Sequence, residues 1–239
     1  MEYSGSVCRM CVPRGCSNLT GLLSSCRLPL SVIVNATHRL QDPRTIRKIL
    51  TIDDSSVLAF AGLNADARVL VDMLRREAQS YRLTMEDAPG VDYLARTLAK
   101  TQQHYTQRGG VRPFGISCLI AGVQGPEGEP YLYQTDPAGT HSRWKAQVIG
   151  GRNSKSLREF LEKQYADKDV AAMQEADCVK LAVQALLEVV DSGAKTMELC
   201  VLRRGGAKEM LTEDKVDAVV KEIEAEQEEK RAGVSGGDE

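Results

Sequence analysis

The sequence has few aromatic residues, few histidines and almost no net charge. Aromatic side chains make up 5% of its 239 residues, with one Trp and three Phe, and His occurs three times. The 31 basic and 33 acidic residues nearly cancel, so the surface as a whole attracts neither nucleic acid nor an anionic membrane. No apolar run approaches the ~20 residues that span a bilayer. We therefore expect no nucleic acid and no membrane among the partners of this chain.

The motifs of several metal-protein and enzyme classes are also missing. The sequence has no His-x3-His pair for a metal and no Gly-x-Ser-x-Gly elbow for a serine hydrolase. Cys8 and Cys11 have the spacing of metal ligands, but nine residues separate Cys16 from Cys26 and no histidine lies among them. We therefore predict no metal site and no cofactor.

The other three cysteines lie in apolar stretches. Cys118, Cys178 and Cys200 are predicted to be small buried side chains of a protein from a reducing compartment. The apolar residues near the N-terminus are interrupted at 24–27, whereas the core of a secretory signal is continuous over ~7–15 residues. The sequence therefore predicts no secretory signal.

Hydrophobic periodicity divides the chain into blocks of strands and blocks of helices. With 42% hydrophobic residues, the chain can bury a full core. Strands are predicted at 31–37, 46–52, 56–61, 114–123, 130–136, 141–149 and 197–202; helices are predicted from 64 to about 80, between 89 and 109, and at 154–164, 175–191 and 212–230. Blocks of this kind favour a layered α/β domain, in which two sheets face each other and helices cover their outer faces.

We predict a single domain with atypical ends. Residues 1–30 show no apolar period and are predicted to be an irregular N-terminal segment. The domain itself covers 31–231, and 232–239 form a disordered acidic tail.

Four motifs carry a resemblance to a known family. They are Phe60–Arg68, Arg112–Cys118, Gln134–Thr140 and Trp144–Ala146. Together they resemble the alpha subunits of the 20S proteasome, over roughly residues 31–231. The resemblance implies a four-layer αββα sandwich of the N-terminal nucleophile hydrolase type, in a noncatalytic member.

The same resemblance implies a function and a set of partners. A chain of this family is a structural subunit of a seven-membered alpha ring, and it contacts neighbouring alpha subunits and the beta ring. The C-terminal tails of regulatory particles dock on the ring, and the particle carries out ubiquitin-dependent protein degradation. We therefore expect localisation in the cytoplasm and the nucleus.

Lys48 is the residue on which two functional hypotheses diverge. In catalytic beta subunits, a lysine at the corresponding place assists an N-terminal threonine, which would make the chain a hydrolase with peptidase activity. The predicted strand from Ser31 onward lacks the aspartate that this chemistry requires, and Thr20 is followed by Gly-Leu-Leu, unlike a catalytic start. We therefore predict no catalytic residue.

The resemblance instead implies a binding role for Lys48, Gly62 and Leu63. In alpha subunits this lysine lies in a pocket between neighbouring subunits, where an ammonium group can pair with the carboxylate of an activator tail. Gly62 would let the tail backbone approach, and Leu63 would contact it. The alternative is a solvated or locally paired lysine at a strand edge.

The first thirty residues depart from the family pattern. Alpha subunits begin with a Tyr-Asp-Arg turn and a helix containing Gln-Val-Glu-Tyr-Ala, and neither occurs here. Three origins fit this departure: a mispredicted start or exon, a divergent paralogue, or a decayed copy. The abrupt onset of the resemblance favours the first.

Overall fold

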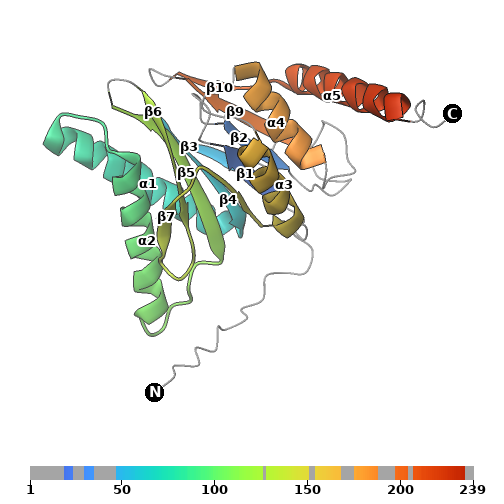
Figure 1. Ribbon diagram of the computed structural model, residues 1–239. Helices are drawn as coiled ribbons and strands as arrows, with labels where there is room; N and C mark the ends of the chain where they lie inside the picture. The colour runs from blue at the N-terminus through green and yellow to red at the C-terminus, as the bar shows by residue number, and fades with distance from the viewer. Residues whose placement is uncertain are drawn as a thin grey trace.

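Two five-stranded antiparallel sheets form the centre of the computed structural model (Figure 1). The structure describes residues 19–23, 30–34, 47–125, 128–150, 154–167, 175–187, 197–203 and 207–234. The first sheet has the order β10-β9-β2-β1-β8, and the second has the order β3-β4-β5-β6-β7.

The strands of both sheets come from segments far apart in the chain. Their bounds are β1 Leu19–Leu23, β2 Leu30–Val34, β3 Ile49–Asp53, β4 Ser56–Gly62, β5 Ile116–Gln124, β6 Glu129–Thr135, β7 His141–Arg143, β8 Ala146–Ile149, β9 Met197–Leu202 and β10 Lys208–Met210. The second sheet is a simple meander, since its strands pair in chain order. The first sheet combines both ends of the described chain, because β2 pairs with β9.

Helices cover the outer face of each sheet. Their bounds are α1 Asn64–Met85, α2 Val91–Gln107, α3 Ser154–Asp167, α4 Glu175–Leu187 and α5 Glu213–Val234. Figure 1 shows α1 and α2 on one side of the paired sheets and α3, α4 and α5 on the other. The predicted four-layer αββα sandwich is therefore confirmed. No helix among the described residues has the length and apolarity that crossing a membrane demands.

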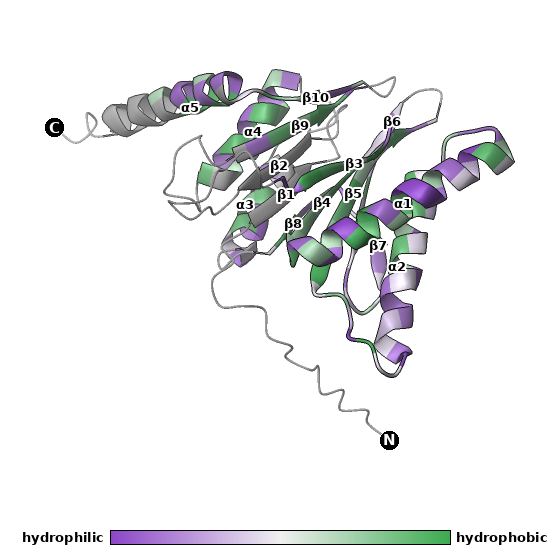
Figure 2. Cartoon of the chain, turned by 180° about the vertical axis from the view of Figure 1, so that it is seen from behind, coloured by the Kyte–Doolittle hydropathy of each residue, from purple (hydrophilic) through white to green (hydrophobic). Residues whose placement is uncertain are grey.

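The alternation of side chains along each strand divides the core into layers. In β4, Val57 and Ala59 join the apolar cluster between the sheets, while Leu58 and Phe60 join the cluster under α1 and α2. The third cluster lies between the first sheet and α3, α4 and α5. Because both faces of β4 are buried, the strand is apolar almost throughout. Figure 2 shows β3, β4 and β5 as mainly hydrophobic, whereas the helices carry both colours.

The prediction that 1–30 are irregular is wrong for 19–23. This stretch forms β1, which pairs with β2 on one side and with β8 on the other. A five-residue strand that contains Thr20 and Gly21 has too weak a pattern to be recognised alone. Pairing on both sides satisfies the backbone hydrogen bonds of this strand, and its own sequence gives no sign of that pairing. Residues 1–18 and 24–29 lie outside the described residues.

The predicted strand 141–149 is in fact two strands, β7 and β8, in different sheets. Arg143 pairs with Tyr133 of β6, and the Trp144 backbone N–H still donates to the carbonyl oxygen of Leu132 at 2.9 Å. The chain then crosses to the first sheet, where Ala146 pairs with Leu23. Period-2 alternation is the same in both sheets, so it gives no sign of the crossing.

Two helices extend past their predicted ends. The helix predicted to end near Ser80 continues to Met85, where Leu83 is 85% exposed and no apolar stripe remains. The α5 helix runs to Val234, so the prediction of a disordered tail is wrong for 232–234; residues 235–239 lie outside the described residues. The short β10 strand was not predicted at all.

Candidate functional site

The three residues predicted to bind an activator tail lie at one end of the β3–β4 hairpin. Lys48 directly precedes β3, Gly62 ends β4, and Leu63 follows it. Ile49 pairs with Ala59, so the register continued by one residue places Lys48 opposite the residue two before Gly62. Such diagonal neighbours lie ~7–8 Å apart. The structure therefore brings the three residues together, at what we call the open end of the hairpin.

Lys48 is buried at this open end. It is 2% exposed, and its backbone N–H donates to Oε2 of Glu198 at 3.2 Å. Glu198 belongs to β9 of the first sheet, so this bond connects the two sheets. The alternative of a solvated lysine is therefore wrong.

Gly62 is required by the packing of the chain itself. Its φ is +134°, and a Cβ added there would lie 2.2 Å from the carbonyl oxygen of Gly115. The Leu63 backbone N–H donates to that same oxygen at 3.3 Å. Any side chain at Gly62 would therefore push the two crossing segments apart. Leu63 itself is 39% exposed and presents an apolar surface beside the glycine.

An ion pair that the sequence did not reveal holds these crossing segments together. The Asp66 carboxylate accepts hydrogen bonds from Arg112 Nη1 at 2.6 Å, from Arg112 Nη2 at 2.7 Å and from the Gly115 backbone N–H at 3.0 Å. The Asp66 side chain is 8% exposed. The hydrogen bonds from the Arg112 guanidinium lower the pKa of Asp66; the Gly115 N–H adds to this effect, and burial opposes it.

The structure thus brings into contact two motifs that lie far apart in the sequence. Phe60–Arg68 supplies the glycine, the leucine and the aspartate, and Arg112–Cys118 supplies the arginine and the second glycine. Asp66 was predicted as a residue of the first helical turn and Arg112 as part of a motif. Their pairing was missed because the two lie 46 positions apart in the chain. The co-occurrence of an acidic and a basic residue in two family motifs was the only available signal.

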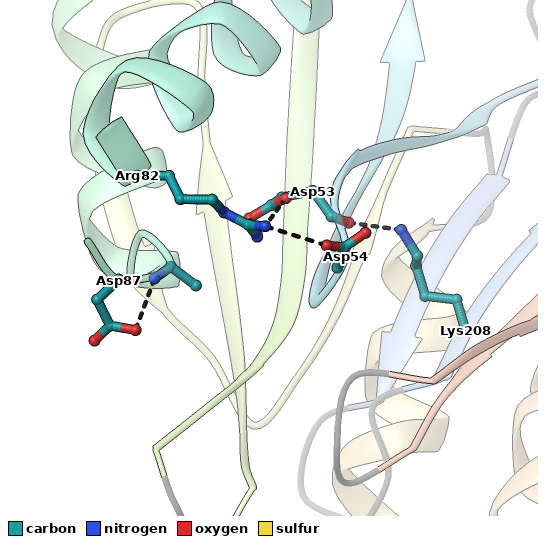
Figure 3. Close-up of polar contacts among 6 residues, drawn as sticks. Asp53, Asp54, Arg82, Asp87 and Lys208 are labelled. Carbon is teal, nitrogen blue, oxygen red and sulfur yellow. Dashed lines mark hydrogen bonds and ion pairs between the residues drawn. The ribbon is translucent and has the colours of Figure 1, made fainter. Parts of the chain in front are cut away.

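The opposite end of the hairpin, which we call the turn end, is closed by a second arginine–aspartate pair (Figure 3). Arg82 Nη2 donates to both carboxylate oxygens of Asp53, at 2.9 and 2.8 Å, and Nη1 donates to Asp54 at 3.3 Å. Lys208 Nζ donates to the Asp53 carbonyl oxygen at 2.6 Å. These bonds join α1, the hairpin and β10. The ion pair therefore holds the exposed end of α1, which explains why that helix continues beyond its apolar stripe.

The geometry gives no support to a nucleophile or a metal centre within the described residues. Thr20 lies inside β1, where it follows Leu19 and pairs with Ile33 and Ile149, so it does not present a free amine to assist catalysis. No group of three or more His, Cys, Asp or Glu in the described part of the chain is placed to hold a metal ion. The Cys8–Cys11 spacing lies outside those residues.

The predicted burial of the three core cysteines is confirmed, with one correction. Burial raises the pKa of the Cys118 thiol to about 12 and that of Cys200 to about 11, so neither is a thiolate at neutral pH. Cys178 is buried but disulfide-bonded, so the prediction of a reduced side chain is wrong there. An apolar stripe reveals burial, but it cannot reveal a second sulfur within bonding distance.

Comparison with known proteins identifies one family. The family model described as "Proteasome subunit" matches residues 31–202. A proteasome subunit alpha type-7 of Dictyostelium discoideum is 52% identical over 199 residues, which cover 83% of this chain and 77% of that protein. A proteasome subunit alpha type-7-like protein of Macaca fascicularis is 48% identical over 213 residues, covering 89% and 84%. A proteasome subunit alpha type-4 of Saccharomyces cerevisiae is 52% identical over 192 residues, covering 80% and 75%.

Proposed function

We propose, since this chain belongs to the proteasome subunit family and is related to its alpha-type members over most of its length, that it is a noncatalytic structural subunit of the 20S alpha ring. In this role it assembles with other proteasome subunits: neighbouring alpha subunits of a seven-membered ring and the subunits of the beta ring. The particle degrades proteins by the ubiquitin-dependent route, in the cytoplasm and the nucleus.

One observation carries the noncatalytic part of this proposal. Thr20, the threonine that a peptidase hypothesis would use, is an internal residue of β1 with backbone partners on both sides. An N-terminal nucleophile needs a free amine on the same residue, which here would require a cut inside β1, between Leu19 and Thr20. The alternative of a peptidase is therefore not favoured.

We assign the docking of activator tails to the open end of the hairpin. Leu63 offers exposed apolar surface there, and Lys48, buried at the same end of the hairpin, would supply the positive charge. A C-terminal carboxylate is the group that such a charge attracts. The tail backbone would lie along Gly62 and Leu63, with its carboxylate directed toward Lys48.

The burial of Lys48 decides how this assignment must be tested. Replacing a buried side chain with Ala leaves a cavity, so Lys48→Ala would lower stability whether or not a tail binds. Lys48→Met keeps most of the volume and removes only the charge, while Lys48→Arg keeps the charge. The pair therefore separates electrostatics from packing.

The experiment uses assembled 20S particles that carry each variant of this chain. A tail peptide with a photo-crosslinker is titrated, and crosslinking to this subunit is quantified. Lys48→Met should weaken binding at this pocket by roughly 10- to 150-fold, the equivalent of a charge-assisted hydrogen bond of ~1.5–3 kcal/mol. Lys48→Arg should retain most of the binding. Equal binding by wild type and Lys48→Met would refute the assigned role.

The scaffold role has its own measurement. Particles reconstituted without this chain should show incomplete alpha rings, and the purified chain should not cleave fluorogenic peptides. Cleavage that disappears in a Thr20→Ala variant would establish the peptidase alternative instead.

A further inference from the structure

We propose that the Asp66–Arg112 ion pair is the positioning element of the tail pocket: it acts through Gly115 to set where Gly62 and Leu63 lie. This inference rests on the docking function proposed above. It assigns a role in affinity to two residues, Asp66 and Arg112, that lie outside the predicted pocket.

The first argument is that a single residue, Gly115, is held from both sides. Its backbone N–H donates to Asp66 Oδ2 at 3.0 Å, and its carbonyl oxygen accepts the Leu63 N–H at 3.3 Å. Leu63 occupies the N-cap position of α1, and Asp66 lies three residues later, in the first turn of the helix. The Leu63 N–H, the carbonyl oxygen and N–H of Gly115, and the Asp66 carboxylate therefore form a ring. Two hydrogen bonds and the chain from Leu63 to Asp66 close this ring next to the end of β4.

The second argument is steric. A Cβ on Gly115 would lie 3.0 Å from Leu63 Cδ1, and a Cβ on Gly62 would lie 2.2 Å from the Gly115 oxygen. Gly115 therefore passes directly against both residues, and because its carbonyl oxygen accepts the Leu63 N–H, a shift of Gly115 would move Leu63 with it. Whatever fixes Gly115 therefore fixes the surface that a tail would contact.

The third argument concerns what fixes Gly115. Asp66 is almost fully buried, yet it satisfies its carboxylate with three hydrogen bonds, all from residues 112–115. Arg112 also donates to its own neighbour, the Pro113 carbonyl oxygen, at 3.1 Å. The guanidinium is thus oriented by its own segment and clamps the aspartate bidentately, an arrangement that fixes direction as well as distance.

The competing explanation is that the Asp66–Arg112 ion pair only stabilises the fold. The molecule contains a second arginine–aspartate pair with which it can be compared. Asp53 at the turn end is likewise buried and paired with an arginine, although there a single nitrogen, Nη2 of Arg82, donates to both carboxylate oxygens. It lies on the same hairpin but at the end away from the predicted pocket. Asp53→Asn therefore controls for the general loss of a buried carboxylate–guanidinium pair.

The test compares four variants of this chain in assembled 20S particles: Asp66→Asn, Arg112→Gln, Arg112→Lys and the control Asp53→Asn. The dissociation constant of the crosslinking tail peptide is measured at this subunit, relative to the crosslinking of the same peptide at another subunit of the particle. Asp66→Asn and Arg112→Gln should raise that constant by about 2- to 30-fold. Arg112→Lys, which keeps the charge without the fork, should have a smaller effect. Asp53→Asn should stay within about twofold of wild type, although its thermal stability falls.

Each outcome decides between the explanations. If Lys48→Met weakens the peptide but Asp66→Asn and Arg112→Gln do not, docking stands and the positioning role is overturned. If Asp53→Asn weakens it as much as Asp66→Asn, the pair acts only through general stability, and the proposal is again overturned. If Lys48→Met itself has no effect, the docking function fails, and this inference fails with it. Arg112 is 59% exposed, so its variants provide the test even if Asp66→Asn does not assemble.

Discussion

The two ends of the β3–β4 hairpin are both closed by an arginine–aspartate ion pair, but they differ in what lies beside the pair. At each end an arginine donates to both carboxylate oxygens of a buried aspartate, Arg112 through two nitrogens and Arg82 through one. At the turn end Arg82 ties α1 to the hairpin through the Asp53 carboxylate, and Lys208 ties β10 to it through the Asp53 carbonyl oxygen. At the open end the pair also holds a backbone amide, and it lies beside two glycines and an exposed leucine.

This difference suggests how an ion pair that only stabilises the fold differs from one that lies beside a binding surface. A stabilising ion pair needs only complementary charges between elements that would otherwise separate. A site in addition leaves backbone and apolar surface accessible where a partner can reach it, and small residues bring segments close together there. The open end has these further features, and the turn end does not. The following predictions test this contrast.

The largest effect should come from Phe60→Ala, which disturbs both ends together. Phe60 is buried on β4 between them, in the cluster under α1 and α2. Its removal should lower the free energy of unfolding by ~3–5 kcal/mol. Denaturant unfolding of the purified chain measures the loss. Hydrogen exchange should accelerate at the Leu63 amide of the open end and at the Val123 amide, which donates to Ser55 beside the turn.

The control for this variant is Phe60→Leu, which should recover most of the stability. Exchange that accelerates at only one of the two amides would mean that the ends are not coupled through β4.

A smaller and more local effect is expected from Gly62→Ala. Its positive φ and the overlap with the Gly115 oxygen should cost ~1–3 kcal/mol. Exchange should accelerate at the Leu63 amide and stay unchanged at Val123. Gly109→Ala is the matched control, because a Cβ there meets nothing within 4 Å. Identical behaviour of the two variants would contradict the close crossing at the open end.

The smallest effect is a pH dependence specific to the open end. The folded-state pKa of Asp66 lies below its usual value of 3.8, mainly because of the hydrogen bonds from Arg112. A depressed pKa contributes stability above the unfolded pKa, and that contribution is lost as the pH falls through the folded value. Asp66→Asn should therefore lose less stability than wild type on acidification below about pH 4. Equal slopes of unfolding free energy against pH in both proteins would count against the ion pair.

Much of the layered fold followed from local patterns. The predicted strand 197–202 coincides with β9, and the break between the predicted strands 46–52 and 56–61 falls where the chain turns from β3 to β4. The long amphipathic helices were found because their apolar stripes repeat at helical spacing. The strands β1 and β10 were missed because they are short and obtain their order from neighbouring strands.

The candidate site was predicted only in part, for the same reason. Lys48, Gly62 and Leu63 were named from their motif, and the structure places them together. Their burial and spacing were not predictable, since Lys48 is covered by elements distant in the chain, including β9. The glycine seemed suited to an approaching ligand, whereas its first requirement is the Gly115 carbonyl.

The sequence by itself determined the class of layers and the family, because periodicity and short motifs are local properties. Tertiary structure alone decided the crossing of the chain between sheets after Arg143, the place of β1 between β2 and β8, and the partnership of Asp66 with Arg112. Each of these depends on segments that meet only after folding. The hydrogen bonds and ion pairs that select which segments come together act at distances of about 3 Å. The spacing of residues along the chain does not reveal such distances.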